Sequence, residues 1–301
     1  MFYLDYSINF KENGEKMKLV VEKSAEGLTL EGFLKRKGFS TRLIKMYKWH
    51  GEMRVNGEKE NVKRVLKEGD VIELSLFDTS SDILPQEMDL SICYEDDEIL
   101  IVDKPAGMVV HPTRRYREGT LANGVAYYFE KKGIKTLIRP VNRLDKGTSG
   151  IVIFAKEPFM QYYLQIVKPM SKFYYAIVNG KLEGEGIIDV PIKRKSFMTI
   201  EREVSEEGDR AITYYKSLKA TEELSLLKIK IATGRTHQIR VHLNYIGHPI
   251  VGDDLYGEPT SYIERPALHA YRVTFFHPLK EKVISVYAPL PEDIKRLFEL
   301  L

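Results

Sequence analysis

The 301-residue sequence predicts an α+β fold in which a mainly antiparallel mixed β-sheet is flanked by a few helices. Apolar segments beyond residue 90 are short, rich in aromatic and β-branched residues and separated by turns, without the strand–helix alternation of a parallel sheet. A polar stretch at 78–88 separates a compact N-terminal block from the rest. We therefore expect an N-terminal strand and small α/β domain at 1–77, a flexible linker at 78–88 and a larger sheet-based domain at 89–301.

The composition is that of an ordinary globular protein, with 43% hydrophobic residues and a formal net charge of +3. Any surface for nucleic acid must therefore be local. The single cysteine, Cys93, excludes an intramolecular disulfide and a multi-cysteine zinc site, which fits a reducing compartment, and the cytoplasm is the expected location. Charged residues interrupt the N-terminus and every long apolar run, so we expect neither a signal peptide nor a membrane span.

The N-terminal block predicts a strand, two short helices and then small strands joined by tight turns. Apolar residues at 19–21 indicate the first strand. Helical spacing predicts one helix that ends at Gly38 and a second helix capped by Ser40. The segments 51–55 and 71–74 follow as strands.

This block also carries a local concentration of positive charge. Between Lys35 and Gly51 there are six Lys or Arg residues and no acidic one, with Tyr47 and Trp49 among them. Such a mixture suits phosphate contacts and base stacking, although a solvated helix face with Trp49 anchored in the core would give the same pattern. The segments at 42–44, 55–57 and 68–72 resemble the S4 RNA-binding domain. That resemblance implies RNA binding through Arg42, Lys45 and Lys48.

The larger domain is predicted to begin with a hairpin at 92–102, built around an acidic turn. Thr120 can cap one helix, and Pro158 fits the first turn of another that continues to Val167. Residues 294–301 place their apolar side chains on one helical face. The remaining strands are expected at 173–178, 187–190, 211–218, 224–232, 273–276 and 283–287.

One carboxylate stands out in the segment 141–155. Asp145 lies between Arg143 and Lys146 on a glycine-containing turn, directly before an apolar run that predicts a buried strand. A neighbouring cation favours the ionised form, which can act as a nucleophile or a general base. From spacing alone, a turn-closing Asp that pairs with Arg143 is the favoured explanation.

The segment resembles the signature of the RluA/RluD-type RNA pseudouridine synthases: His-Arg-Leu-Asp, two variable residues, Thr-Ser-Gly and an apolar strand. Asn142 stands where that family usually has His. The resemblance implies that Asp145 is the catalytic nucleophile, acting on a uridine flipped out of structured RNA. The uridine would be isomerised to pseudouridine without a cofactor.

Two further segments resemble the same family. Residues 234–240 match its Gly-Arg-Thr-His-Gln-Ile-Arg motif, which implies that Arg240 pairs with the catalytic Asp, with Arg235 as the second choice. We expect Thr236 to cap a helix there, so that His237 and Arg240 share a face near a positive helix terminus. Residues 172–180 match the motif that places the active-site tyrosine at Tyr174, where it could stack on a base or move a proton. By spacing alone, a strand tyrosine is more often a core residue.

The resemblance covers nearly all of the chain from residue 90 and makes 89–301 the catalytic domain. Residues 104–107 match it as well. A metal site is not expected, because His237, His242 and His248 with Asp253 match no zinc spacing. Beyond the N-terminal block, the residues expected to contact RNA are Lys104, Arg143, Arg235 and His237.

The expected partner is RNA, with large-subunit ribosomal RNA as the usual substrate of this domain pair and tRNA as the alternative. We expect no membrane and no obligate protein partner. Two other functions remain open: a non-catalytic RNA-binding ribosome-assembly factor with the same domains, and a hydrolase that uses Asp145 as its nucleophile. A hydrolase would release a cleaved product, whereas isomerisation leaves the mass of the substrate unchanged.

Overall fold

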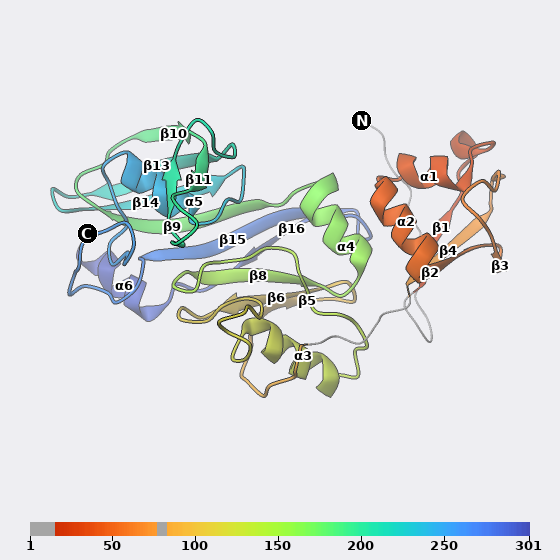
Figure 1. Ribbon diagram of the computed structural model, residues 1–301, viewed down its shortest axis with the longest axis horizontal. Coiled ribbons are helices and arrows are strands. Elements are labelled where there is room, and N and C mark those ends of the chain that lie inside the picture. Colours follow the sequence, from red (N-terminus) through yellow and green to blue (C-terminus); the bar gives the residue numbers. More distant parts are fainter. Residues whose placement is uncertain (1–15, 77–82) are drawn as a thin grey trace.

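The computed structural model describes residues 16–76 and 83–301 and contains a small and a large β-sheet (Figure 1). Residues 1–15 and 77–82 of the expected domain and linker lie outside the described residues. The N-terminal block lies beside one end of the large sheet. No helix in the described ranges is both long and apolar enough to cross a membrane.

The small sheet and its two helices follow the sequence pattern. Ser40 caps the second helix, because its side-chain oxygen accepts a hydrogen bond of 3.0 Å from the Leu43 N–H. The strand order is β1 (Lys16–Val20), β4 (Val71–Leu76), β2 (Gly51–Val55) and β3 (Glu58–Lys59). The two helices are α1 (Leu30–Arg36) and α2 (Thr41–His50), preceded by the short 3₁₀ turn η1 (Lys23–Ala25).

The large sheet is mixed and mostly antiparallel, which confirms the predicted fold class. Its strands follow the order β10 (Glu185–Asp189), β13 (Ile212–Ala220), β14 (Leu224–Ile231), β9 (Ser171–Asn179), β15 (Leu268–His277), β8 (Ser149–Ala155), β6 (Ile99–Lys104) and β5 (Ser91–Glu95), with β16 (Lys282–Tyr287) beside β15 and β7 (Arg139–Pro140) beside β8. Among the described strands, only β15 and β8 pair in parallel.

Five helical segments accompany this sheet. Thr120 caps the first of them as expected. Their bounds are α3 (Leu121–Lys131), α4 (Pro158–Tyr162), the π-helical turn η2 (Tyr163–Val167), α5 (Gln238–Tyr245) and α6 (Glu292–Glu299).

Strand β8 is buried on both faces, which explains its uninterrupted apolar sequence. Val152 and Phe154 belong to the cluster packed around α3, whereas Ile151 and Ile153 belong to the cluster that includes α4. A strand with one solvent-exposed face alternates polar and apolar residues, whereas a strand buried on both faces is apolar throughout. The turn that carries Asp145 therefore leads into a strand that is fixed by packing on both faces.

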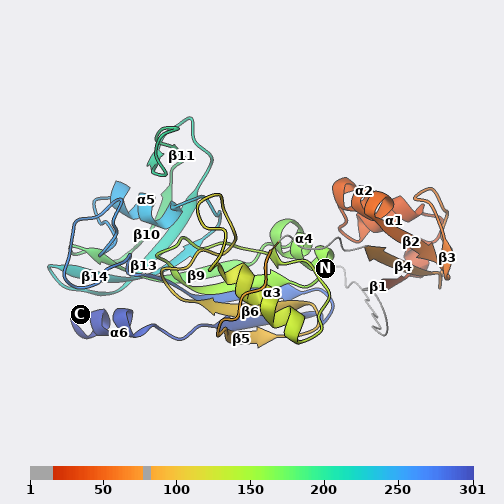
Figure 2. The same cartoon turned by 60° about the horizontal axis from the view of Figure 1, so that its bottom comes forward.

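Two features differ from the sequence prediction. Thr236 does not cap α5; the helix begins at Gln238, and His237 occupies the cap position in the left-handed region with φ 57°. A two-stranded hairpin, β11 (Ile192–Arg194) with β12 (Arg202–Val204), was not predicted because its strands are short and highly charged. This hairpin projects from the body of the molecule near α5 (Figure 2).

Candidate active site

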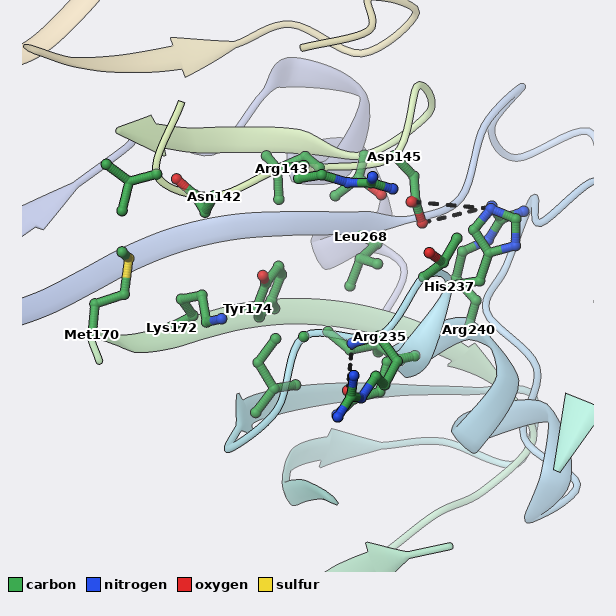
Figure 3. A pocket seen from close by; sticks show the side chains of 18 of the residues that line it. Asn142, Arg143, Asp145, Met170, Lys172, Tyr174, Arg235, His237, Arg240 and Leu268 are labelled. Atoms are coloured by element: carbon green, nitrogen blue, oxygen red, sulfur yellow. Dashed lines mark hydrogen bonds and ion pairs between the residues drawn. The ribbon is translucent and has the colours of Figure 1, made fainter. Parts of the chain in front are cut away.

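A cavity of about 360 Å³ lies where the turn before β8, the start of β9 and the start of α5 meet (Figure 3). These segments are far apart in the sequence, and the pairing of β15 with both β8 and β9 brings them together. The cavity lining includes six of the ten site residues expected from the sequence: Arg143, Asp145, Tyr174, Arg235, His237 and Arg240.

Asp145 sits on a turn that is held by its own backbone and by a buried lysine. The Thr148 N–H donates to the Asp145 carbonyl at 3.1 Å. The Lys104 ammonium donates to the carbonyl oxygens of Pro105 and Met108 at 2.8 and 2.7 Å, and to that of Lys146 at 3.3 Å. Burial of Lys104 lowers its pKa to about 7. The expectation that Lys104 contacts RNA is therefore wrong: its side chain is fully buried and supports the loop instead.

Arg240 is the arginine next to Asp145, but its shortest contacts are with other carboxylates. Its Nε and Nη2 donate to the two carboxylate oxygens of Asp253 at 2.7 and 2.6 Å, and Nη2 also donates to Asp254 at 3.0 Å. Its Nη1 lies 3.8 Å from Asp145 Oδ2. Asp253 thus orients the Arg240 guanidinium so that its Nη1 faces Asp145. The sequence analysis considered Asp253 only as a metal ligand.

Arg235 lies at the edge of the cavity and does not pair with Asp145. Its Nε donates to the Arg210 carbonyl at 3.1 Å, and its Nη1 lies 3.4 Å from Asp209. Its exposed guanidinium remains accessible to a large ligand. Arg143 is also exposed on the cavity lining.

Lys172 and Tyr174 are two residues apart on β9, so their side chains lie on the same face of the strand, and both line the cavity. Tyr174 is buried, and burial together with the nearby Asp145 raises the pKa of its hydroxyl, which keeps it protonated at neutral pH. Burial lowers the pKa of Lys172. Sequence reasoning did not select Lys172, although its spacing of two from Tyr174 places it on the same face of the strand.

His237 lies beside the carboxylate rather than on an outer surface. Its Nε2 is 4.0 Å from Asp145 Oδ1, and its Nδ1 is 2.9 Å from the Tyr256 hydroxyl. Burial is the largest influence on this imidazole and lowers its pKa. His237 is therefore neutral at physiological pH.

Asn142, which replaces the histidine usual in the resembling family, holds the start of the turn against β8. Its side-chain amide donates to the Ile151 carbonyl at 3.0 Å, and its side-chain oxygen accepts from the Ile153 N–H at 2.9 Å. Asn142 thus uses both polar atoms for backbone support.

The basic residues of the N-terminal block are not part of this cavity. Lys45 and Lys48 are exposed on α2, and the Arg42 side chain lies outside the described residues. Trp49 is 71% exposed, with the Lys48 ammonium 5.1 Å from its ring centroid. This exposure rules out Trp49 as a core anchor and leaves an aromatic ring accessible among the lysines.

The sequence model of a family described as RNA pseudouridylate synthase matches residues 98–245, which contain Asp145, Tyr174 and Arg240. A Bacillus subtilis protein named uncharacterized RNA pseudouridine synthase YjbO is 35% identical over 279 residues, covering 90% of this chain and 99% of the relative. The chain belongs to the RNA pseudouridine synthase family. It is accordingly an isomerase that acts on RNA.

Other members of the family agree with this assignment. Ribosomal large subunit pseudouridine synthase D of Xanthomonas campestris is 32% identical, covering 94% of this chain and 91% of the relative. Among solved structures, human RNA Pseudouridylate Synthase Domain Containing 1 is 27% identical, with a TM-score of 0.55 over 67% of this chain and 84% of that chain. The fold is thus shared with a solved pseudouridylate synthase structure over about two thirds of this chain.

Proposed function

We propose that this pseudouridine synthase uses Asp145 as the nucleophile on a uridine flipped into the cavity. The observation that carries the proposal is the position of the carboxylate: it lies on the cavity lining with Tyr174, and the Arg240 guanidinium faces it at 3.8 Å. An ionised carboxylate beside a fixed cation is suited to attack an electrophilic carbon. Flipping is required because C1′ of a stacked nucleotide is out of reach of a side chain that lines a cavity.

The reaction is an exchange of two bonds at the ribose. Asp145 attacks C1′, the bond from C1′ to N1 breaks, and uracil leaves as an anion. The freed base turns within the cavity and its C5 attacks C1′, which displaces the carboxylate. Loss of the proton from C5 and protonation of N1 restore aromaticity and charge, so no cofactor or other reactant is consumed. Tyr174 stacks on the base, and its protonated hydroxyl can donate a hydrogen bond.

We further propose large-subunit ribosomal RNA as the substrate, with tRNA as the alternative. The relatives from Xanthomonas campestris and Zymomonas mobilis, which are 32% and 36% identical to this chain, are named ribosomal large subunit pseudouridine synthase D. This substrate places the protein in the cytoplasm, where ribosomes are assembled. Arg143 and Arg235 are exposed at the cavity edge and suit contacts with the phosphates beside the flipped nucleotide.

The N-terminal part, 1–77, is proposed to be an S4-like RNA-binding domain joined by a linker at 78–88 to the catalytic domain at 89–301. The support is the exposed α2 face, where Lys45, Lys48 and Trp49 combine charge with an accessible ring. This face would hold RNA that is remote from the target uridine.

The test is carbodiimide mapping of pseudouridine in unmodified ribosomal RNA and tRNA treated with the wild-type protein or with the Asp145→Asn variant. We expect new reverse-transcription stops only with wild type, because an amide is a far weaker nucleophile than a carboxylate. Both proteins should bind RNA equally. Stops produced by Asp145→Asn would overturn the assigned nucleophile. Binding without stops by either protein, on free RNA and on ribosomal particles, would favour the non-catalytic assembly factor.

A further inference from the structure

His237 is held in an unfavourable backbone conformation directly beside the proposed nucleophile. It is one of three non-glycine residues with positive φ in the described chain, and it makes no side-chain cap for α5. A left-handed conformation is costly for a residue with a Cβ and persists only when surrounding contacts demand it. The His237 side chain is only 9% exposed, so its ring is enclosed by neighbouring groups that hold this conformation.

The contacts of the Tyr256 hydroxyl define which nitrogen of the His237 imidazole carries the proton. This hydroxyl accepts a hydrogen bond of 2.7 Å from the Arg202 backbone N–H at the start of β12. Its only proton is then available for His237 Nδ1, which lies 2.9 Å away. Nδ1 is therefore the acceptor, and the imidazole proton resides on Nε2, the atom that faces Asp145 Oδ1 at 4.0 Å.

The opposite arrangement is electrostatically unfavourable. A proton on Nδ1 would leave the Nε2 lone pair directed at a carboxylate, and the hydroxyl would have to accept two hydrogen bonds while its own proton found another acceptor. Burial raises the pKa of Tyr256 to about 12, so the hydroxyl keeps its proton at physiological pH.

Tyr256 also touches the other group that faces Asp145. The guanidinium carbon of Arg240 lies 5.2 Å from the centroid of the Tyr256 ring, within the range of a cation–π contact. The backbone N–H of Tyr256 donates to Asp253 Oδ1 at 3.1 Å, the oxygen that also binds Arg240. One residue thus contacts both the imidazole and the guanidinium.

We propose that Tyr256 is a positioning residue: through its hydroxyl it fixes His237 as the Nε2–H tautomer, directs that N–H at Asp145 and ties both to the β11–β12 hairpin through Arg202. This inference rests on the proposed role of Asp145. His237 then presents an N–H dipole to the carboxylate from one side, at 4.0 Å, while the Arg240 cation faces it from the other at 3.8 Å. This arrangement fixes the electrostatic surroundings of the carboxylate before attack on C1′.

The first test reads the tautomer directly. Long-range ¹H–¹⁵N correlation spectra of the full chain, assigned with His237→Gln, should show the Nε2–H form of His237 at pH 7.5. In Tyr256→Phe, which retains the ring, we expect a mixture of tautomers. Tyr262→Phe serves as the matched control, because its side chain is exposed and does not line the cavity. A wild-type His237 in the Nδ1–H form, or an unchanged tautomer in Tyr256→Phe, would overturn the proposal.

The second test measures turnover. Tyr256→Phe should lower kcat about tenfold with little change in KM, as expected for the loss of one positioning hydrogen bond. In a His237→Gln background the same substitution should have almost no further effect, because the residue it acts through is gone. Independent, multiplicative losses would overturn the proposed linkage. Because the tautomer is read without substrate, an error in the role of Asp145 is distinguishable from an error in the role of Tyr256.

Discussion

At the scale of single residues, the site consists of one carboxylate with partners that are themselves anchored. The Arg240 guanidinium lies 3.8 Å from Asp145 Oδ2, near the outer limit of an ion pair, and Nε2 of the neutral His237 lies 4.0 Å from Asp145 Oδ1. Each is held more tightly from behind, by Asp253 and by Tyr256 respectively. Such an arrangement leaves the carboxylate oxygens available for reaction while fixing the charges around them.

We predict that Asp253→Asn destabilises the protein and reduces turnover. The Asp253 side chain is fully buried against Arg240, so its neutralisation leaves a buried guanidinium without its main counter-charge, at a cost of about 3 kcal/mol. Urea unfolding and single-turnover kinetics provide the two readouts. The matched control is Asp254→Asn, which touches the same guanidinium from a 79% exposed side chain and should cost less than about 1 kcal/mol. Equal losses in the two variants would contradict the assigned anchor.

At the scale of elements, the parallel pairing of β8 with β15 decides where the Asp145 turn is placed. Gly150 follows that turn with φ 115°, and a Cβ there would collide with the backbone of Ala270. One residue earlier, Ser149 pairs with His269, and their side chains lie 2.9 Å apart inside the sheet. The contact between these two strands is therefore tight and buried.

We predict that His269 makes stability fall as the pH decreases below about 6.5. Burial lowers the pKa of His269 to about 4, whereas the unfolded chain titrates near 6.5. Between these values the unfolded state binds more protons than the folded state, so the free energy of unfolding decreases with falling pH, by about 3 kcal/mol in total. Urea unfolding at pH 7 and 4.5 measures the decrease.

The variant His269→Gln isolates this contribution from the carboxylates that titrate in the same range. Its loss of stability between the two pH values should be smaller than that of wild type by most of the 3 kcal/mol. The control His111→Gln alters an exposed histidine and should behave as wild type. Identical pH dependence in wild type and His269→Gln would show that the buried imidazole is not responsible.

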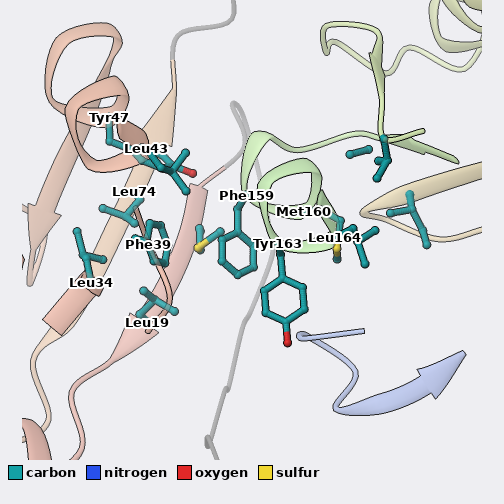
Figure 4. Packing of buried hydrophobic residues seen from close by; sticks show 14 of the residues in the cluster. Leu19, Leu34, Phe39, Leu43, Tyr47, Leu74, Phe159, Met160, Tyr163 and Leu164 are labelled. Carbon is teal, nitrogen blue, oxygen red and sulfur yellow. The ribbon is translucent and has the colours of Figure 1, made fainter. Parts of the chain in front are cut away.

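At the scale of the whole molecule, the N-terminal block packs against the catalytic sheet through an aromatic contact (Figure 4). The rings of Phe39 and Phe159 stack with centroids 5.2 Å apart, and both side chains are buried. Phe159 is the second residue of α4, so the contact joins the block to the helix that packs on β8. The basic α2 face is thereby held at a set orientation to the cavity.

We predict that Phe39→Ala releases the N-terminal block without unfolding the large sheet. Loss of the buried ring removes about 3 kcal/mol from the contact, and small-angle X-ray scattering should then show a larger radius of gyration. RNA affinity should fall because the two proposed binding surfaces are no longer held together. The control Trp49→Ala removes an exposed ring of the same block and should weaken RNA binding without expanding the molecule. An unchanged radius in Phe39→Ala would contradict the prediction.

The sequence by itself predicted the features that depend on residues close together in the chain. The structure agrees with the predicted fold class, with most strand positions and with the caps at Ser40 and Thr120. It also places Arg240, rather than Arg235, next to Asp145. Periodicity and capping involve residues that are close in the chain, and the family motifs mark the functional segments directly.

Only the tertiary structure decided how these segments meet. It buried Lys104, placed Asp253 behind Arg240, brought Tyr256 to His237 and started α5 at Gln238. The β11–β12 hairpin likewise depends on packing rather than on its own charged sequence. The physical reason is that burial and ion pairing depend on the distances between segments that are far apart in the chain, and those distances are set by the sheet as a whole.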